Sequence, residues 1–186
     1  PERAPLVVDY VDALRDVCGI DMRTADSETL ANAASADADL RAAMGNELDD
    51  WLDLLLATRV IPTFAMDRLT VLRHYPARQA ALARRCPDDP TVADRFEVFL
   101  GPVELANGYV ELVDSADLGT RIDRDNKNRK KRGRPVRPVD KTLLAALDAG
   151  LPDCAGVAMG LERLQMLHDK TDDIRDVITF AFEEGA

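Results

Sequence analysis

The residues best suited to chemistry lie in one short apolar run, 103–112. Glu104, Asn107 and Glu111 place two carboxylates and a carboxamide within it. Burying an unpaired charge costs roughly several kcal/mol, so these side chains require a cation, an ammonium group or water beside them. In a regular strand the side chains alternate between faces, and Glu104 would point away from the other two. The run is therefore a candidate site, and a local irregularity of the strand is needed to bring its polar side chains to one face.

A β-bulge would bring these side chains to one face, and the small residues Ala106 and Gly108 favour such an irregularity. The converged carboxylates could hold a divalent cation whose shell is completed by nucleotide oxygens, as magnesium sites with phosphates usually are. One carboxylate and Asn107 could also hold an amino group. An edge strand whose polar side chains face water fits the same residues, and the spacing alone leaves both interpretations open.

A second segment, 156–163, combines Gly156 and Gly160 with Arg163. An arginine in the first turn of a helix that leaves a strand can set a permanent charge against phosphate, and the glycines let a flat base or a backbone approach. The segment has neither the Gly-Lys-Ser/Thr of a phosphate-binding loop nor the Gly-x-Gly-x-x-Gly of a dinucleotide site. Close packing of the glycines explains the spacing equally well.

Composition fits one globular domain, because the chain has 186 residues and 46% of them are hydrophobic. No run reaches the roughly eighteen apolar residues of a membrane helix, and the first residues lack a secretory-signal pattern, so we expect a cytoplasmic location. Cys18, Cys86 and Cys154 are widely spaced and odd in number, which predicts neither a disulfide framework nor structural zinc.

Charge is distributed unevenly along the chain. The net charge is −10, yet the segment 121–137 holds nine Lys/Arg against two Asp. Such asymmetry can dock an acidic partner or a phosphate backbone. A solvated basic helix and loop is the alternative.

The apolar pattern predicts a helical region over 1–59 and a sheet region over 60–186. The expected helices cover 6–17, a stretch from 27, 48–58, 115–132, 140–149 and 160–167. The expected strands are 60–64, 70–72, 74–76, 95–100, 103–112 and a buried strand at 154–159. Gly101-Pro102 suggests a tight turn, so the two strands around it should pair antiparallel. The predicted fold class is α+β, a largely antiparallel sheet flanked by helices.

In the segment 156–163 the chain resembles class II aminoacyl-tRNA synthetases. The third signature of that family is a strand, a glycine and an arginine on the following helix, which here is the stretch from Gly156 to Arg163. The resemblance is greatest to the lysyl-tRNA synthetase branch, and within it to the truncated paralogues that modify elongation factor P. The matching segments are 75–77, 94–97, 104–108, 111–112, 150–154 and 174–178. The first and second signatures are not found, so the chain is similar to the carboxy-terminal part of the catalytic domain, a partial domain spanning 1–186.

The resemblance implies an activity. Lysine or (R)-β-lysine would be activated by ATP and magnesium as an aminoacyl-adenylate and transferred to a lysine of elongation factor P. The same family also charges tRNA(Lys), and a noncatalytic synthetase-like binding module is a third possibility. The full-length protein would be a homodimer, and the fragment alone is expected to be inactive or nearly so.

The resemblance also implies roles for single residues. Arg163 would be the catalytic contact to the terminal phosphates of ATP, with Glu104, Gly156 and Gly160 completing the nucleotide site. Glu104 and Glu111 would ligate magnesium. The substrate pocket would be formed by Ala106, Asn107, Tyr109 and Glu111, with the methyl group of Ala106 narrowing it in favour of (R)-β-lysine.

Overall fold

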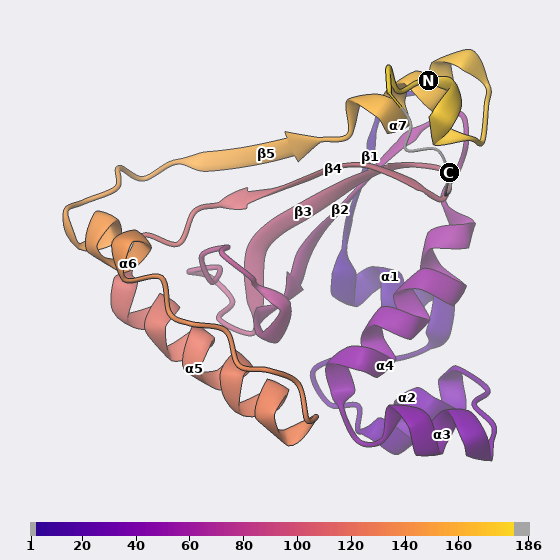
Figure 1. Cartoon of the computed structure of the whole chain (residues 1–186). Coiled ribbons are helices and arrows are strands. Elements are labelled where there is room, and N and C mark those ends of the chain that lie inside the picture. Colours follow the sequence, from indigo (N-terminus) through magenta and orange to yellow (C-terminus); the bar gives the residue numbers. More distant parts are fainter. Residues whose placement is uncertain (1–2, 181–186) are drawn as a thin grey trace, which may run out of the picture.

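The structure is a computed structural model that describes residues 3–180. Residues 1, 2 and 181–186 lie outside this part, including the first two residues of the amino-terminal stretch considered above. One five-stranded sheet has the order β1-β2-β3-β4-β5 (Figure 1). The strands are β1 Leu6–Asp9, β2 Leu69–Pro76, β3 Val92–Leu100, β4 Val103–Val110 and β5 Ala155–Met159. β1 runs parallel to β2 and the other neighbours are antiparallel, which confirms the α+β expectation.

Helices lie at both ends of this sheet. The α-helices are α1 Tyr10–Cys18, α2 Ser27–Ala33, α3 Ala38–Met44, α4 Leu48–Leu55, α5 Ser115–Lys131, α6 Lys141–Asp148 and α7 Leu161–Asp169. Short 3-10 turns occur at Ile61–Thr63, Ala77–Gln79 and Ile174–Asp176. Figure 1 shows α1 to α4 gathered on one side of the molecule, α5 and α6 on the other, and α7 following β5.

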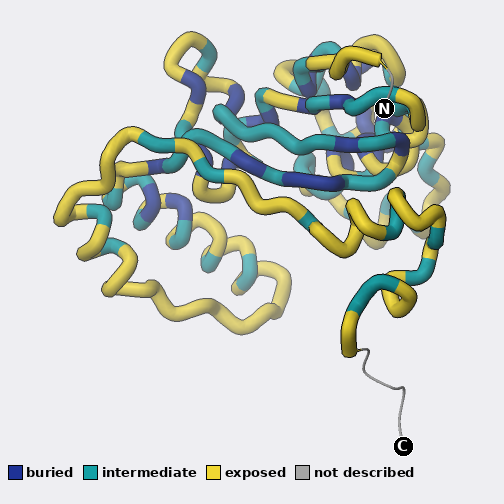
Figure 2. The backbone as a smooth tube through the Cα atoms, turned by 90° about the horizontal axis from the view of Figure 1, so that it is seen from above, coloured by how far each residue is buried: buried dark blue, intermediate teal, exposed yellow. Residues whose placement is uncertain are grey.

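The main core lies between α1, α4 and one face of the sheet. Its large, fully buried side chains include Tyr10, Leu14, Trp51, Leu55 and Leu72. Each such burial contributes about 1.5–3 kcal/mol relative to exposure. Figure 2 shows that buried residues concentrate in this part, and α6 and α7 bury no residue. The helices near the carboxyl end are therefore held to the fold by few apolar contacts.

Two predictions for the amino-terminal part of the chain gave the wrong kind of secondary structure. Residues Leu6–Asp9 form a strand, because this β-branched stretch pairs in parallel with β2, and the helix begins only at Tyr10. The segment 60–64, expected as a strand, is helical, since α4 continues through a π-helical turn at Leu56–Val60 into a 3-10 turn. A proline in the first turn of a helix loses no needed hydrogen bond, so Pro62 is compatible with this turn.

Other predicted elements are present, some with different boundaries or exposure. The stretches 70–72 and 74–76 belong to one strand, β2, whose register shifts at His74. The strand expected to be buried at 154–159 is present as β5, but Val157 is 64% exposed and Met159 is 55% exposed, because β5 is an edge strand. The antiparallel pair around Gly101 and the helices at 115–132 and 140–149 are confirmed.

Gly108 marks the tightest packing inside the sheet. A Cβ added there would lie 2.6 Å from the carbonyl oxygen of Gly156 and 2.6 Å from Cζ of Phe96. One obstacle is backbone and cannot rotate away, and overpacking costs about 1–3 kcal/mol. We expect Gly108→Ala to lower the free energy of unfolding by this amount, measured by chemical denaturation followed by circular dichroism.

Gly119 in α5 provides the matched control. A Cβ there meets nothing within 4 Å, so Gly119→Ala should raise the free energy of unfolding by about 0.5–1 kcal/mol through helix propensity. Equal stability of the two variants would contradict this account of the sheet.

Candidate active site

The β3–β4 pair contains the expected bulge. Val98 pairs with Ala106 and Phe99 pairs with Glu104, so Leu105 is an extra residue on β4. The expected irregularity is therefore present, one residue before Ala106 and not at Gly108. Because a bulge adds one residue to one strand only, it reverses the alternation on that strand beyond this point.

The bulge brings the polar side chains of β4 to one face. Paired residues of antiparallel strands point to the same side of the sheet. Asn107 pairs with Glu97 and Tyr109 pairs with Arg95, while Glu104 pairs with Phe99 two residues further along β3. Glu104, Asn107 and Tyr109 therefore share a face with Glu97 and Arg95.

Glu97 is a central residue of this face that the sequence analysis did not assign. Its Oε1 accepts hydrogen bonds from Nη2 of Arg95 at 2.6 Å and from Nδ2 of Asn107 at 3.2 Å, and its side chain is only 12% exposed. Arg95 also lies over the ring of Tyr75, 4.4 Å from its centroid, and donates to the carbonyl of Gln79. This network fixes the amide of Asn107, leaving its oxygen free to accept from a ligand.

Burial and charge also affect the tyrosines of this face. Burial, followed by the nearby Glu97 carboxylate, raises the pKa of Tyr75 above its ordinary value. Burial, followed by the negative charge of Glu111, raises the pKa of Tyr109 as well. Both phenols therefore remain neutral hydrogen-bond donors at physiological pH.

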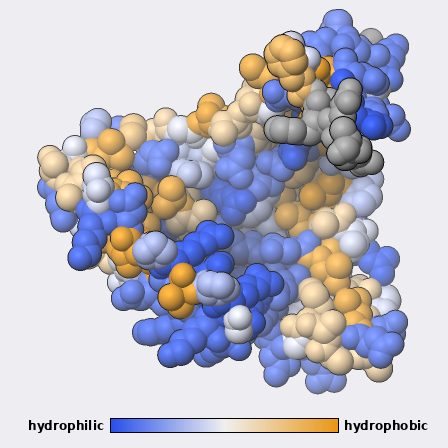
Figure 3. Space-filling view, viewed as in Figure 1, coloured by the Kyte–Doolittle hydropathy of each residue, from blue (hydrophilic) through white to orange (hydrophobic). Residues whose placement is uncertain are grey.

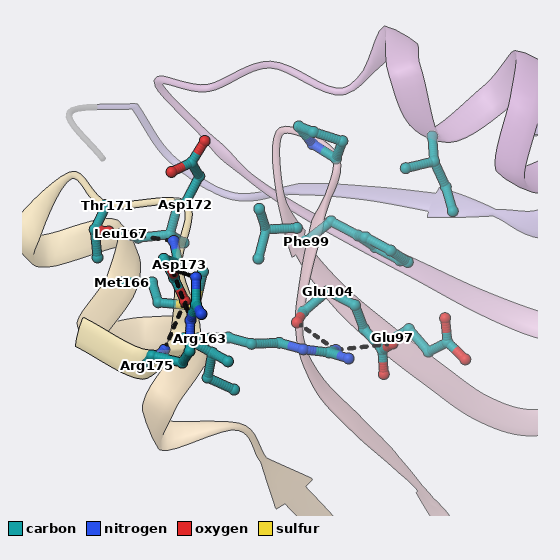
Figure 4. A pocket seen from close by; sticks show the side chains of 14 residues that line it. Glu97, Phe99, Glu104, Arg163, Met166, Leu167, Thr171, Asp172, Asp173 and Arg175 are labelled. Atoms are coloured by element: carbon teal, nitrogen blue, oxygen red, sulfur yellow. Dashed lines mark hydrogen bonds and ion pairs between the residues drawn. The ribbon is translucent and has the colours of Figure 1, made fainter. Parts of the chain in front are cut away.

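Arg163, Glu104 and Glu97 line one groove of about 990 Å³ (Figure 4). Arg163 comes from the first turn of α7 and donates from Nη1 to the backbone oxygen of Glu104 at 2.9 Å and to its Oε2 at 3.2 Å. Figure 4 shows its side chain extending from α7 toward Glu104, with Glu97 beside them. A permanent cation thus stands next to two carboxylates, which suits a phosphate chain accompanied by a divalent cation.

The whole face is hollowed between α5 and the α4 side of the molecule. Figure 3 shows hydrophilic residues across much of this hollow and a hydrophobic patch toward α4. A second cavity of about 380 Å³ shares Glu97 with the first and is lined by Tyr75, Arg95 and Gln79 among others. The face therefore offers two adjoining spaces, one beside Arg163 and one beside Arg95.

Glu111 is not part of the groove, which corrects the expected metal site. It lies just beyond the opposite end of β4 from Glu104, and a strand rise of about 3.3 Å per residue places their Cα atoms roughly 20 Å apart. One cation cannot contact both carboxylates at that separation. The carboxylate that lines the groove together with Glu104 is Glu97.

Glu111 instead packs against β5. A Cβ on Gly156 would lie 2.7 Å from Oε1 of Glu111, so only glycine leaves room for the carboxylate as it stands. Gly156 also pairs with Tyr109. Tyr109, Glu111 and Gly156 therefore form one end of the site, remote from Arg163.

Gly160 has a different role at the end of β5. Its N–H donates to the carbonyl of Leu105 at 2.9 Å, and a Cβ there would touch the Cδ of Arg163 at 3.4 Å. The residue thus ties the start of α7 to the bulge and leaves the arginine side chain free to fold over the sheet.

Ala106 is not brought into the site. It pairs with Val98 and with Met159, and its side chain is buried on the face opposite to Asn107. The methyl group that lies across from Asn107 on the site face belongs to Ala158 of β5. Alternation along β5 could have indicated this, because Gly156, Ala158 and Gly160 fall at every second position.

A mostly antiparallel sheet, with an arginine of the following helix set beside strand carboxylates, is the arrangement of class II synthetase domains. The family model for tRNA synthetases class II (D, K and N) matches residues 8–184, and the chain belongs to this family.

Among curated proteins, the chain is similar to elongation factor P–(R)-β-lysine ligases. It is 42% identical to that of Klebsiella pneumoniae (strain 342) over 177 residues, which are 95% of this chain and 54% of the relative. It is 41% identical to that of Photorhabdus laumondii with the same coverage, and 42% identical to that of Proteus mirabilis over 92% of this chain and 53% of the relative. The chain thus spans about half the length of the curated relatives it matches.

None of the helices within residues 3–180 has the length and apolar character needed to cross a membrane.

Proposed function

We propose that the full-length protein activates lysine or (R)-β-lysine with ATP as an aminoacyl-adenylate, releases pyrophosphate and transfers the aminoacyl group to a lysine of elongation factor P. The observation that carries this proposal is the groove in which Arg163 lies beside Glu104 and Glu97. The names of the curated relatives support the choice of substrate and acceptor. A cytoplasmic location and a homodimer are part of the same proposal and rest on the family alone.

At the groove, Glu104 and Glu97 would hold Mg²⁺, and Arg163 would bind the terminal phosphates. The cation would neutralise phosphate charge during attack of the amino-acid carboxylate. The pairing of Arg163 with Glu104 supports this role, because it holds the guanidinium inside the groove. Adenylation depends on such positioning and charge stabilisation.

At the other end, Asn107 and Glu111 would bind the amino groups of the substrate, and Tyr109 would line the pocket. Glu111 would supply the negative charge, and Asn107 would accept through the oxygen that Glu97 leaves free. Ala158, which pairs with Asn107, would set the width of this pocket in place of Ala106. One methyl group is worth about 1–3 kcal/mol of discrimination, so it would tune the choice between lysine and β-lysine.

The basic segment of α5 would contact the acceptor. Arg121 is not available for this, because it is buried and donates to the carbonyls of Ala81 and Ala83. Lys127, Lys130 and Lys131 are exposed on the same helix. These lysines would attract an acidic acceptor through long-range electrostatics.

Replacement of Arg163 tests the nucleotide site. Loss of one preorganised charge at a transition state costs about 10²–10³-fold in rate, so Arg163→Ala should reduce ATP–pyrophosphate exchange by the full-length protein to this extent. Arg15 is the matched control, since it is 50% exposed against 51% for Arg163 and also forms an ion pair. Arg15→Ala should leave exchange unchanged. Unchanged exchange in Arg163→Ala would remove this arginine from the nucleotide site, and no exchange by the unaltered full-length protein would favour a noncatalytic module.

Replacement of Gly156 tests the amino-acid end. The added methyl group must displace the Glu111 carboxylate, which is a flexible side chain, so the fold should tolerate the change. We expect Gly156→Ala to raise the KM for the amino acid by about tenfold, equivalent to about 1.4 kcal/mol, with little change in the KM for ATP. Exchange assays at varied concentrations of amino acid and of ATP separate the two KM values. A change in the KM for ATP alone would show that Glu111 is not part of the amino-acid pocket.

The acceptor is tested by direct competition. The full-length protein is given ATP, Mg²⁺ and labelled lysine or (R)-β-lysine, with elongation factor P and tRNA(Lys) together. We expect the label on the protein. Label on tRNA(Lys) would make this a conventional synthetase, label on neither would refute the transfer reaction, and adenylate formed by the 186-residue chain alone would refute its expected inactivity.

A further inference from the structure

A second group of reactive side chains lies away from the groove. His74, Cys86 and Asp94 each offer one ligand atom, and these atoms lie within 4.8 Å of one another. Within residues 3–180 this is the one such group of three. It opens onto a separate cavity of about 420 Å³. The three residues come from β2, from the β2–β3 connection and from β3, so the fold assembles them from separate segments.

The backbone fixes the positions of His74 and Cys86. His74 has φ 57°, in the left-handed region, at the point where the register of β2 shifts between Arg73 and Tyr75. Such a conformation is unfavourable for a non-glycine residue, so the surrounding strands must impose it. Cys86 is buried, and its N–H donates to the carbonyl of Val92 at 3.0 Å, which fixes the connection against β3.

Each side chain keeps an atom for a ligand. Nδ1 of His74 lies 3.1 Å from Oδ1 of Asp9, which leaves Nε2 as the free nitrogen. Arg84 donates to Oδ2 of Asp94 from Nε and Nη2, which leaves Oδ1. A carboxylate behind a histidine is the usual outer partner of a metal-bound imidazole, because it orients the ring and raises its basicity.

The charge of the cavity also favours a cation. Its wall carries four aspartates, Asp9, Asp88, Asp89 and Asp94, against the two arginines Arg23 and Arg84. Asp89 is already engaged by Arg23 at 2.6 Å and by Thr91, so it is not a candidate ligand. Asp9 and Asp94 are paired with Arg73 and Arg84, so the excess negative charge of the wall is that of Asp88, which a divalent cation would offset.

We propose that, against the expectation from the cysteine spacing, His74, Cys86 and Asp94 form a binding site for a zinc-class divalent metal ion, with a water molecule from the cavity as the fourth ligand. The ligand set decides the class, because thiolate and imidazole select zinc-like ions and Mg²⁺ or Ca²⁺ prefer oxygen. With metal–ligand bonds of about 2.0–2.3 Å, tetrahedral ligands are roughly 3.3–3.8 Å apart, so a closure of about 1 Å suffices.

The position of this site indicates what the ion would do. His74 and Asp94 directly precede Tyr75 and Arg95, whose side chains interact on the site face of the sheet. The ion would clamp β2, β3 and their connection from behind that pair. This role does not depend on the reaction proposed above, so each can fail without the other.

Cobalt substitution provides the test. The full-length protein, freed of metal by chelation, is titrated with Co²⁺ and followed by absorption spectroscopy. We expect saturable binding with a thiolate-to-cobalt charge-transfer band in the near ultraviolet and intense visible bands of a tetrahedral ion, both removed by Zn²⁺. Zn²⁺ should also raise the thermal unfolding temperature.

Variants identify the ligands. Cys86→Ser should abolish the charge-transfer band, whereas the control variants Cys18→Ser and Cys154→Ser should keep it. Asp9→Asn should retain the band but weaken Co²⁺ binding about 10–100-fold, as expected for a residue that positions the imidazole. If Cys86→Ser does not fold, His74→Gln replaces it as the test variant, and circular dichroism checks that His74→Gln is folded. A band that survives Cys86→Ser or His74→Gln, or the absence of saturable binding, would overturn the site.

Discussion

The site depends on one extra residue in β4. Without Leu105 as a bulge, the pairing of β3 with β4 would continue in simple register beyond Val98, and Glu104 would point to the face opposite Asn107. The groove would then lose a carboxylate, and the reverse face would gain a charge. A displacement of one residue thus decides whether these polar side chains form a site or are scattered over both faces of the sheet.

The same bulge also positions α7. The carbonyl of Leu105 accepts the N–H of Gly160, and the carbonyl of Glu104 accepts from Nη1 of Arg163. Both acceptors belong to the irregular part of β4, where the regular ladder is interrupted and backbone groups become available. The strand that carries the carboxylates therefore sets the place where the arginine-bearing helix begins.

Much of this arrangement could be predicted from local pattern. The turn at Gly101 and the helices at 115–132 and 140–149 could be predicted because each depends on residues close in sequence. The strand β1 was missed because its only strand partner in the sheet is β2, about sixty residues away in sequence. Tertiary pairing overrides local propensity in such short segments.

The site itself was predicted in part for the same reason. The strand carrying Glu104 and Asn107 was found, but which carboxylate accompanies Glu104 depends on the register between strands, and a single strand does not contain that information. Glu97 becomes visible only when β3 is placed beside β4. Ala106 was assigned to the pocket from the family resemblance alone, whereas simple alternation with Asn107 sets its side chain on the opposite face of the sheet.

The pairing of Arg163 with Glu104 explains how a site built for a charged ligand keeps its charges balanced before the ligand arrives. The ion pair lies in a groove where both side chains are partly exposed, so its own contribution to stability is small. Under the proposed function its value would lie in orientation, because a guanidinium held by two oxygens of Glu104 would already be ordered when a phosphate replaced the carboxylate. Exchange of one anionic partner for another would then keep Arg163 paired at each stage. The Glu97 carboxylate on the neighbouring strand is likewise paired with a cation, the guanidinium of Arg95.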